Sequence, residues 1–160
     1  MKSSSLLGTH NSGSYSIKPY SLIAPDMDHG FLRYIPNFLV TPIFFKWSVT
    51  QWTGFTTQLQ NGIRYFDLRV AFGTKYCSQT VPDDASKIYG CFYFVHGLYA
   101  SRVADEFKKI RKFLDEHPKE VVILDFQHFY AMDKQKKAIF SRLVEEVMRA
   151  CSLLTLLLIC

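Results

Sequence analysis

Four short runs of apolar residues recur along the chain, and turn-forming residues bound each of them. Runs of this length are typical of buried strands rather than of helices. The predicted strands cover residues 3–9, which lead directly to His10, and then residues 63–70, 91–97 and 121–129.

Amphipathic stretches between and after these runs predict helices. The stretch after the third strand has apolar residues at helical spacing; we expect Ser101 to cap it and Pro118 to stop it. A second helix is predicted from Asp133 to Val147, and a short one over residues 53–61. Strands that alternate with helices indicate βα units and a mainly parallel sheet.

Two segments depart from this alternation. Residues 18–52 contain four prolines, which preclude one long helix, and many aromatic residues, so we expect an excursion or lid after the first strand. Residues 151–160 form a very apolar end, in which 153–159 read LLTLLLI. A membrane-spanning helix needs roughly 20 apolar residues, so this run is not expected to span a bilayer.

Polar residues gather at the predicted carboxyl ends of the strands. Both a doubly wound sheet and a (β/α)8 barrel fit the alternation of elements, but barrel enzymes place their chemistry at these strand ends. We therefore predict a barrel-like α/β fold. The residues concerned are His10, Asp67, Arg69, His96, Gln127 and His128.

Composition narrows the class of protein. With 160 residues, 48% of them hydrophobic, the chain is expected to bury one core. A net charge of +5 suits an anionic partner such as a membrane surface, although on charge alone surplus solvated lysines are the better explanation. The basic residues fall on predicted helix faces, and no known nucleic-acid-binding motif is recognisable among them, so no nucleic-acid role is expected.

The four cysteines show neither a CxxC motif nor the Cys/His spacing of a zinc site. Cys77 and Cys91 bracket a polar loop and could be bridged in an exported protein. No signal sequence is apparent in residues 1–7. We therefore expect a cytoplasmic protein with free thiols.

Alternation along the second strand separates its chemistry from its core. Tyr65, Asp67 and Arg69 share one face, and the residues between them share the other. A buried Asp67–Arg69 ion pair that only holds the barrel is one interpretation. The alternative is chemical: His10 and His96 at nearby strand ends could act as base and acid, while Arg69 binds a phosphate.

Four motifs resemble the X region of phosphatidylinositol-specific phospholipase C, in the order that the family has them. They are GTHNS, GIRYFDLRV, FYFVHGL and VVILDFQHFY, and the resemblance runs from about Leu6 to about Val147. The closest resemblance is to the compact X-domain-containing subgroup. It implies a phosphodiesterase barrel of ~250 residues, of which residues 1–150 would be about the first half and 151–160 a tail foreign to the family.

The resemblance also implies roles for individual residues. His10 matches the general base that deprotonates the inositol 2-hydroxyl, and His96 the acid that protonates the diacylglycerol oxygen. Arg69 matches the phosphate-stabilising arginine of bacterial members, and Asp67 an acidic residue that supports the acid step. Substrate contacts are expected from Asn11, Gln127 and His128.

Calcium-dependent relatives have carboxylates at the positions of Arg69 and Gln127, so we expect metal-free chemistry without a cofactor. The expected partner is a phosphatidylinositol-type lipid, met by a cytoplasmic protein that binds peripherally at membranes. Two rival functions remain: a glycerophosphodiester phosphodiesterase, which would need a carboxylate metal cluster, and a non-catalytic lipid-binding or regulatory fragment.

Overall fold

The computed structural model describes residues 6–27, 34–77, 84–148 and 156–159. Within these ranges the strands form one sheet in the order β4-β3-β2-β5-β6, and β1 pairs with β2 beside this path. The strands are β1 (Leu7–Thr9), β2 (Ile63–Phe72), β3 (Phe92–His96), β4 (Leu98–Arg102), β5 (Val122–Tyr130) and β6 (Leu156–Ile159).

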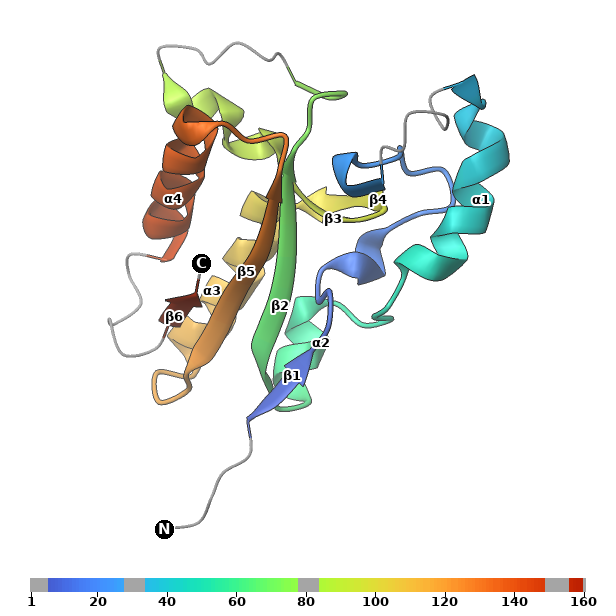
Figure 1. Ribbon diagram of the computed structural model, residues 1–160. Coiled ribbons are helices and arrows are strands. Elements are labelled where there is room, and N and C mark those ends of the chain that lie inside the picture. The colour runs from blue at the N-terminus through green and yellow to red at the C-terminus, as the bar shows by residue number, and fades with distance from the viewer. Residues whose placement is uncertain (1–5, 28–33, 78–83, 149–155, 160) are drawn as a thin grey trace.

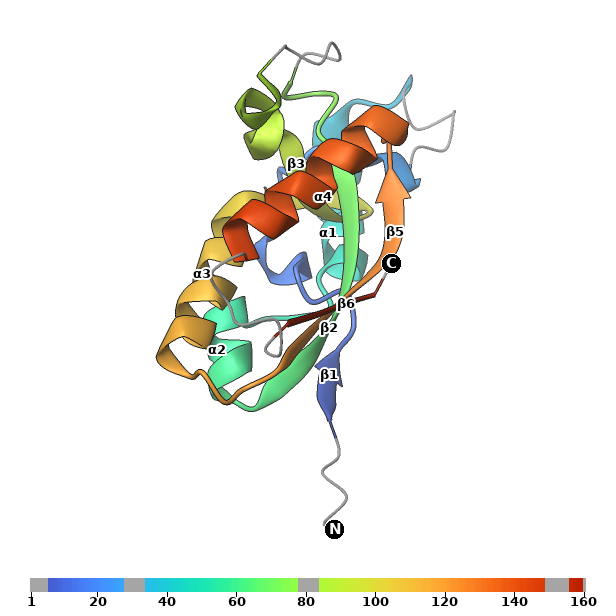
Figure 2. The same ribbon diagram turned by 90° about the vertical axis from the view of Figure 1, so that its left-hand side faces the viewer.

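Strand direction divides the sheet into two parts. β1, β2, β5 and β6 are parallel to one another, whereas β3 is antiparallel to β2 and β4 antiparallel to β3. The helices are α1 (Asn37–Ser48), α2 (Phe55–Gln60), α3 (Val103–Glu116) and α4 (Lys134–Met148), and the 3-10 turns are η1 (Ser14–Ser16), η2 (Pro25–Met27) and η4 (Ala85–Cys91). α3 and α4 lie together on one side of β2 and β5, and α1 lies on the other side (Figures 1 and 2). An open, partly parallel sheet whose parallel strands are covered by α3 and α4 on one face is the arrangement expected of part of a barrel.

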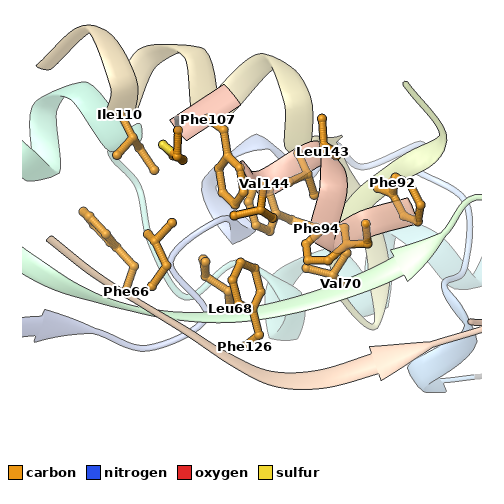
Figure 3. Packing of buried hydrophobic residues seen from close by; sticks show 14 of the residues in the cluster. Phe66, Leu68, Val70, Phe92, Phe94, Phe107, Ile110, Phe126, Leu143 and Val144 are labelled. Carbon is orange, nitrogen blue, oxygen red and sulfur yellow. The ribbon is translucent and has the colours of Figure 1, made fainter. Parts of the chain in front are cut away.

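The main core lies between the sheet and its helices. Phe66, Leu68 and Val70 of β2 are fully buried, as the alternation along this strand predicted. They face Phe107 of α3 and Leu143 of α4 (Figure 3). The opposite face of β2 is thereby left for polar residues.

The third predicted strand was expected to lead directly into a helix, but in the structure a further strand follows it. The chain reverses at Gly97 into β4, so the helix begins at Val103 and Ser101 lies in a strand instead of capping the helix. Gly97 has a φ of +73°, and a Cβ atom there would lie 2.9 Å from both the Met27 Cε and the Ser48 Oγ atoms. Only glycine readily fits this tight hairpin, which the apolar pattern did not reveal.

The second predicted helix start is confirmed. The Asp133 carboxylate accepts a hydrogen bond from the Lys136 backbone N–H at 2.8 Å, which is the contact of an N-terminal cap. α4 then covers the sheet with its apolar side.

The described parts of the aromatic segment 18–52 do not form one long helix. Pro19 and Pro36 lie outside helices, Pro25 begins η2, and Pro42 is inside α1. α1 anchors itself through Val40 to a second core cluster that includes Ile17, Ile23 and Leu98. Among the described residues, no helix is long and apolar enough to cross a membrane.

The expectation of free thiols is wrong for two of the cysteines. Cys77 and Cys91 form a disulfide, with their Cα atoms 6.0 Å apart. The antiparallel pairing of β2 with β3 places Phe72 opposite Phe92. That pairing brings together the two loop ends that carry the cysteines, a consequence of the hairpin topology that the sequence did not predict.

The apolar tail contributes a strand. β6 pairs in parallel with the first half of β5, from Val122 opposite Leu156 to Asp125 opposite Ile159. The tail was expected to lie outside the family's pattern, but it occupies the place of the next parallel strand.

Candidate active site

His10 follows β1 directly, and hydrogen bonds to its backbone carbonyl hold it in place. Its carbonyl oxygen accepts hydrogen bonds from the Thr50 hydroxyl and from the Gln51 side-chain amide, both at 3.0 Å. The imidazole itself is exposed, with its Nδ1 atom 2.5 Å from the Asp67 Oδ2 atom. A fixed backbone and one fixed ring nitrogen leave Nε2 as the nitrogen available for chemistry.

Asp67 comes from the polar face of β2, and its side chain is only 13% exposed. The resemblance implied that this residue supports the acid step, but the structure places its carboxylate on His10 and not on His96. The same Oδ2 atom also lies 3.4 Å from the backbone N–H of Asn11. Asp67 is therefore positioned to orient the imidazole of His10.

Asn11 occupies a buried turn immediately after His10. Its φ of +46° is in the left-handed region that asparagine tolerates better than most residues. This turn brings the Asn11 side-chain nitrogen to 2.9 Å from the His10 Nε2 atom. Any substrate hydroxyl that uses Nε2 must displace this contact.

His96 ends β3 and faces His10 across the site. The two ring centroids are 6.3 Å apart, with the ring planes at 80°. The Nδ1 atom of His96 lies 2.9 Å from the carbonyl oxygen of Ser48, the last residue of α1. The contact again engages Nδ1 and leaves the Nε2 atom for a ligand.

Arg69 lies on the same face of β2 as Asp67, but the two do not form the ion pair that was the alternative interpretation. Among the described residues, Asp67 pairs with His10, and the buried Nε atom of Arg69 has no hydrogen-bond partner. A half-buried guanidinium with an unsatisfied donor is suited to an anionic ligand.

Gln127 lines an open cavity of about 330 Å³ together with His10, Tyr65 and Asp67. Its side-chain amide and the Tyr65 hydroxyl both donate to the carboxylate of Asp125. The hydrogen bond between the Tyr65 hydroxyl and Asp125 is the main reason that the pKa of Tyr65 is raised. Gln127 therefore belongs to the site.

His128 is less clearly part of the site. Its ring is 5.8 Å from that of Tyr130, and it is not among the residues that line the cavity. A register shift after Leu68 pairs Arg69 with His128 in the backbone ladder. The two residues are thus neighbours in the sheet, but among the described residues no contact joins the His128 side chain to His10 or His96.

Several residues that hold the site were missed by sequence reasoning. Thr50 and Gln51 fix the backbone of His10, Ser48 binds His96, and Asp26 accepts a hydrogen bond from the Gly97 N–H at 2.7 Å. All lie in the excursion 18–52. Only the tertiary fold brings them to the strand ends.

The donor set does not fit a calcium site. Among the described residues, no group of three or more His, Cys, Asp or Glu side chains is arranged to hold a metal ion. Ca²⁺ prefers six to eight oxygen ligands, several of them carboxylates, whereas Arg69 brings a positive charge into this site. The chain's own residues thus favour an anion over a cation beside the histidine pair.

Comparison with solved structures defines the fold class. Two structures of phosphatidylinositol-specific phospholipase C from Staphylococcus aureus each match with a TM-score of 0.52. The first is 18% identical and covers 88% of this chain and 36% of its own. The second is 15% identical and covers 90% of this chain and 38% of its own. The protein thus has the mixed α/β fold of this barrel, of which its open sheet forms a part, and the expected fold class is confirmed.

Curated relatives define the family, although no family model matches the chain. The chain is 42% identical to human PI-PLC X domain-containing protein 2 over 127 residues, which are 79% of this chain and 38% of that protein. It is 38% identical to human PI-PLC X domain-containing protein 3 over 129 residues, 79% of this chain and 37% of that one. A variant-surface-glycoprotein phospholipase C from Trypanosoma cruzi is 31% identical over 134 residues, 79% of this chain and 32% of its own length. The chain belongs to the family of PI-PLC X domain-containing proteins, and it spans less than two fifths of the length of these relatives.

Proposed function

We propose that the protein is a phosphodiesterase that cleaves the glycerol–phosphate bond of phosphatidylinositol-type lipids by acid–base catalysis. The observation that carries the proposal is the pair of oriented imidazoles, whose centroids lie 6.3 Å apart. One is held by a carboxylate and the other by a backbone carbonyl. At this separation both rings can reach oxygens of one phosphodiester.

In the first half of the reaction, His10 acts as the base. With Nδ1–H donated to Asp67, the Nε2 atom takes the proton of the inositol 2-hydroxyl. The hydroxyl oxygen then bonds to phosphorus. The imidazolium that forms is stabilised by the carboxylate beside it.

In the second half, His96 acts as the acid. Its Nδ1–H is held by the Ser48 carbonyl, so its Nε2–H faces the site and protonates the glycerol oxygen as the phosphorus–oxygen bond breaks. Arg69 neutralises charge on the non-bridging phosphate oxygens. The products are a cyclic inositol phosphate and diacylglycerol.

The assay uses phosphatidylinositol vesicles and measures water-soluble phosphate with and without EDTA. Release that persists in EDTA supports the proposal. Release abolished by EDTA would favour a metal-dependent phosphodiesterase, and vesicle binding without release would favour a non-catalytic lipid-binding role.

An exposed apolar surface on α1 supports action at a membrane. Its residues face solvent: Phe38 and Trp47 are 73% and 77% exposed, and Leu39 and Ile43 are also exposed. Lys46 is exposed on the same helix and would favour anionic lipid. Exposed aromatic residues beside a cation are typical of a helix that lies in a bilayer interface.

The aromatic residues of segment 31–47 suggest a lipid contact through Phe38, Phe44, Phe45 and Trp47, aided by Arg33 and Lys46, but the fold does not expose all of these side chains. Phe44 and Phe45 are half-buried and pack on the second core cluster, so they are not free to enter lipid. Arg33 lies outside the described residues. Because Ser48 of the same helix binds His96, lipid held by α1 would be delivered beside the acid.

A further inference from the structure

Asp26 is an acidic residue beside the histidine pair for which the proposed mechanism has no use. It lies in η2, and its Oδ2 atom accepts the hydrogen bond of the Gly97 N–H at 2.7 Å. Its Oδ1 atom is buried and has no hydrogen-bond partner among the described residues. Desolvating a carboxylate in this way costs free energy unless something compensates.

The peptide that Asp26 holds is the one that follows His96. Backbone hydrogen bonds fasten the surrounding segments, from Ala24 N–H to the Gly97 carbonyl at 3.0 Å and from Tyr99 N–H to the Leu22 carbonyl at 3.0 Å. The carboxylate of Asp26 thus closes a set of contacts that fixes where the His96 backbone ends its strand.

Electrostatic interactions extend from Asp26 to the site. Burial raises the pKa of the Asp26 carboxyl, and the hydrogen bond from Gly97 partly offsets this effect. The positive charges of His96 and Arg69 lower the same pKa further. On the other side, the Asp26 charge contributes to raising the pKa values of Tyr99 and Tyr130.

We propose that Asp26 is a positioning residue for His96, fixing its backbone through Gly97 and favouring the protonated imidazole by its negative charge. The inference rests on the proposed function, because it assigns Asp26 to the acid of that reaction. His10 has its own carboxylate in Asp67, so each histidine would have one acidic partner. The Asp26 carboxylate acts across the Gly97 peptide, and the Asp67 carboxylate acts by direct contact.

The pH dependence of the free energy of unfolding distinguishes this electrostatic role of Asp26 from a purely structural one. A carboxyl whose folded pKa is raised stabilises the fold below its unfolded pKa, and this contribution is lost as pH rises through the folded pKa. Asp26→Asn retains an oxygen to accept the Gly97 hydrogen bond but removes the buried charge. The variant should therefore be at least as stable as the wild type near pH 7, with its advantage shrinking toward pH 4.

The experiment follows the imidazole NMR signals of the intact protein through a pH titration. In Asp26→Asn the midpoint of the His96 titration should move down by at least ~0.5 pH unit, while that of exposed His117 stays in place. The alkaline limb of the pH–rate profile should move in the same direction. Asp115→Asn, which removes an exposed carboxylate paired with Arg111, is the matched control and should change neither.

The NMR and melting readouts need no turnover, so the inference can fail independently of the proposed function. A His96 midpoint unchanged in Asp26→Asn overturns it, as does a large fall in melting temperature with no change in that midpoint. If the variant does not fold, the wild type still provides a test. Its Asp26 carboxyl carbon signal should show a second inflection at the His96 midpoint, and the lack of one overturns the inference.

Discussion

The carboxylate of Asp67 lies 2.5 Å from the imidazole of His10, although 57 positions separate the two residues in the chain. Parallel pairing of β1 with β2 makes this contact, because it places Thr9 opposite Phe66. His10 and the carboxylate that orients its ring are therefore brought together by neighbouring strands.

We expect Asp67→Asn to reduce turnover by about 10²-fold or more, because the imidazolium formed at His10 would lose its charged partner. The melting temperature should change little, since the side chain lies at the edge of a solvent-open cavity. Steady-state assays on phosphatidylinositol vesicles measure the first effect. Asp115→Asn should retain full activity, and equal losses in both variants would remove any special role for Asp67.

Replacing either histidine should nearly abolish turnover. General acid–base groups contribute ~10²–10⁴-fold, so His10→Ala and His96→Ala should each lose activity on this scale. His117→Ala controls for loss of an exposed histidine far from the site, where the ring stacks on Phe113. Losses below about tenfold in both site variants would contradict the two-histidine mechanism.

The strand and helix pattern of this fold could be predicted wherever local sequence dominates. β2 alternates between a buried and a polar face, and α3 and α4 repeat apolar residues at helical spacing, so both signals are present in short windows. The β3–β4 hairpin was missed because Gly97 acts through its positive φ, which an apolar run does not encode.

The site could be predicted only in part, for a related reason. His10 and His96 stand at strand ends, whereas Asp67 and Arg69 lie within β2, and topology alone brings the four residues together. Asp26 and Ser48 reach the same place from an irregular excursion, where no periodicity indicates which way a side chain points. The contact of Asp67 with His10 was not predicted either, because strand neighbours do not follow from chain order.

The α1 surface should insert into anionic membranes. In Trp52→Phe, where Trp47 is the only remaining tryptophan, emission should shift to the blue on adding phosphatidylinositol-containing vesicles, because the exposed ring of Trp47 leaves water. Sedimentation with the same vesicles should fall in Trp47→Ala.

Tyr20→Ala serves as the control for that surface, because Tyr20 is 79% exposed but lies outside α1. Its vesicle binding should equal that of the wild type. An unshifted Trp47 emission, with binding unaffected by Trp47→Ala, would show that lipid does not contact this helix.

The Cys77–Cys91 bond should stabilise the fold. It spans 14 positions, and closing a loop of this size restricts the unfolded chain by roughly 3 kcal/mol. Cys77→Ser/Cys91→Ser should therefore melt at a lower temperature than the wild type, whereas Cys151→Ser should not.

The same bond tests the expected cytoplasmic location, because disulfides persist mainly in oxidising compartments. Thiol labelling in cells followed by peptide mass analysis distinguishes the two states. Bridged cysteines in cells would place the protein outside a reducing cytoplasm. Labelled Cys77 and Cys91 would instead agree with the cytoplasmic expectation.

The last prediction concerns β6, which pairs with the edge of β5 over Val122–Asp125. An unpaired apolar parallel edge invites association with other chains, so the β6 backbone should protect the protein from aggregation. Leu157→Pro introduces a residue that cannot donate to the ladder and is disfavoured inside a sheet. We expect its light-scattering mass to rise with concentration more steeply than that of the wild type. Leu157→Val retains the backbone donor and should behave as the wild type does. A Leu157→Pro protein with the same mass and the same cooperative melting transition would show that this edge needs no cover.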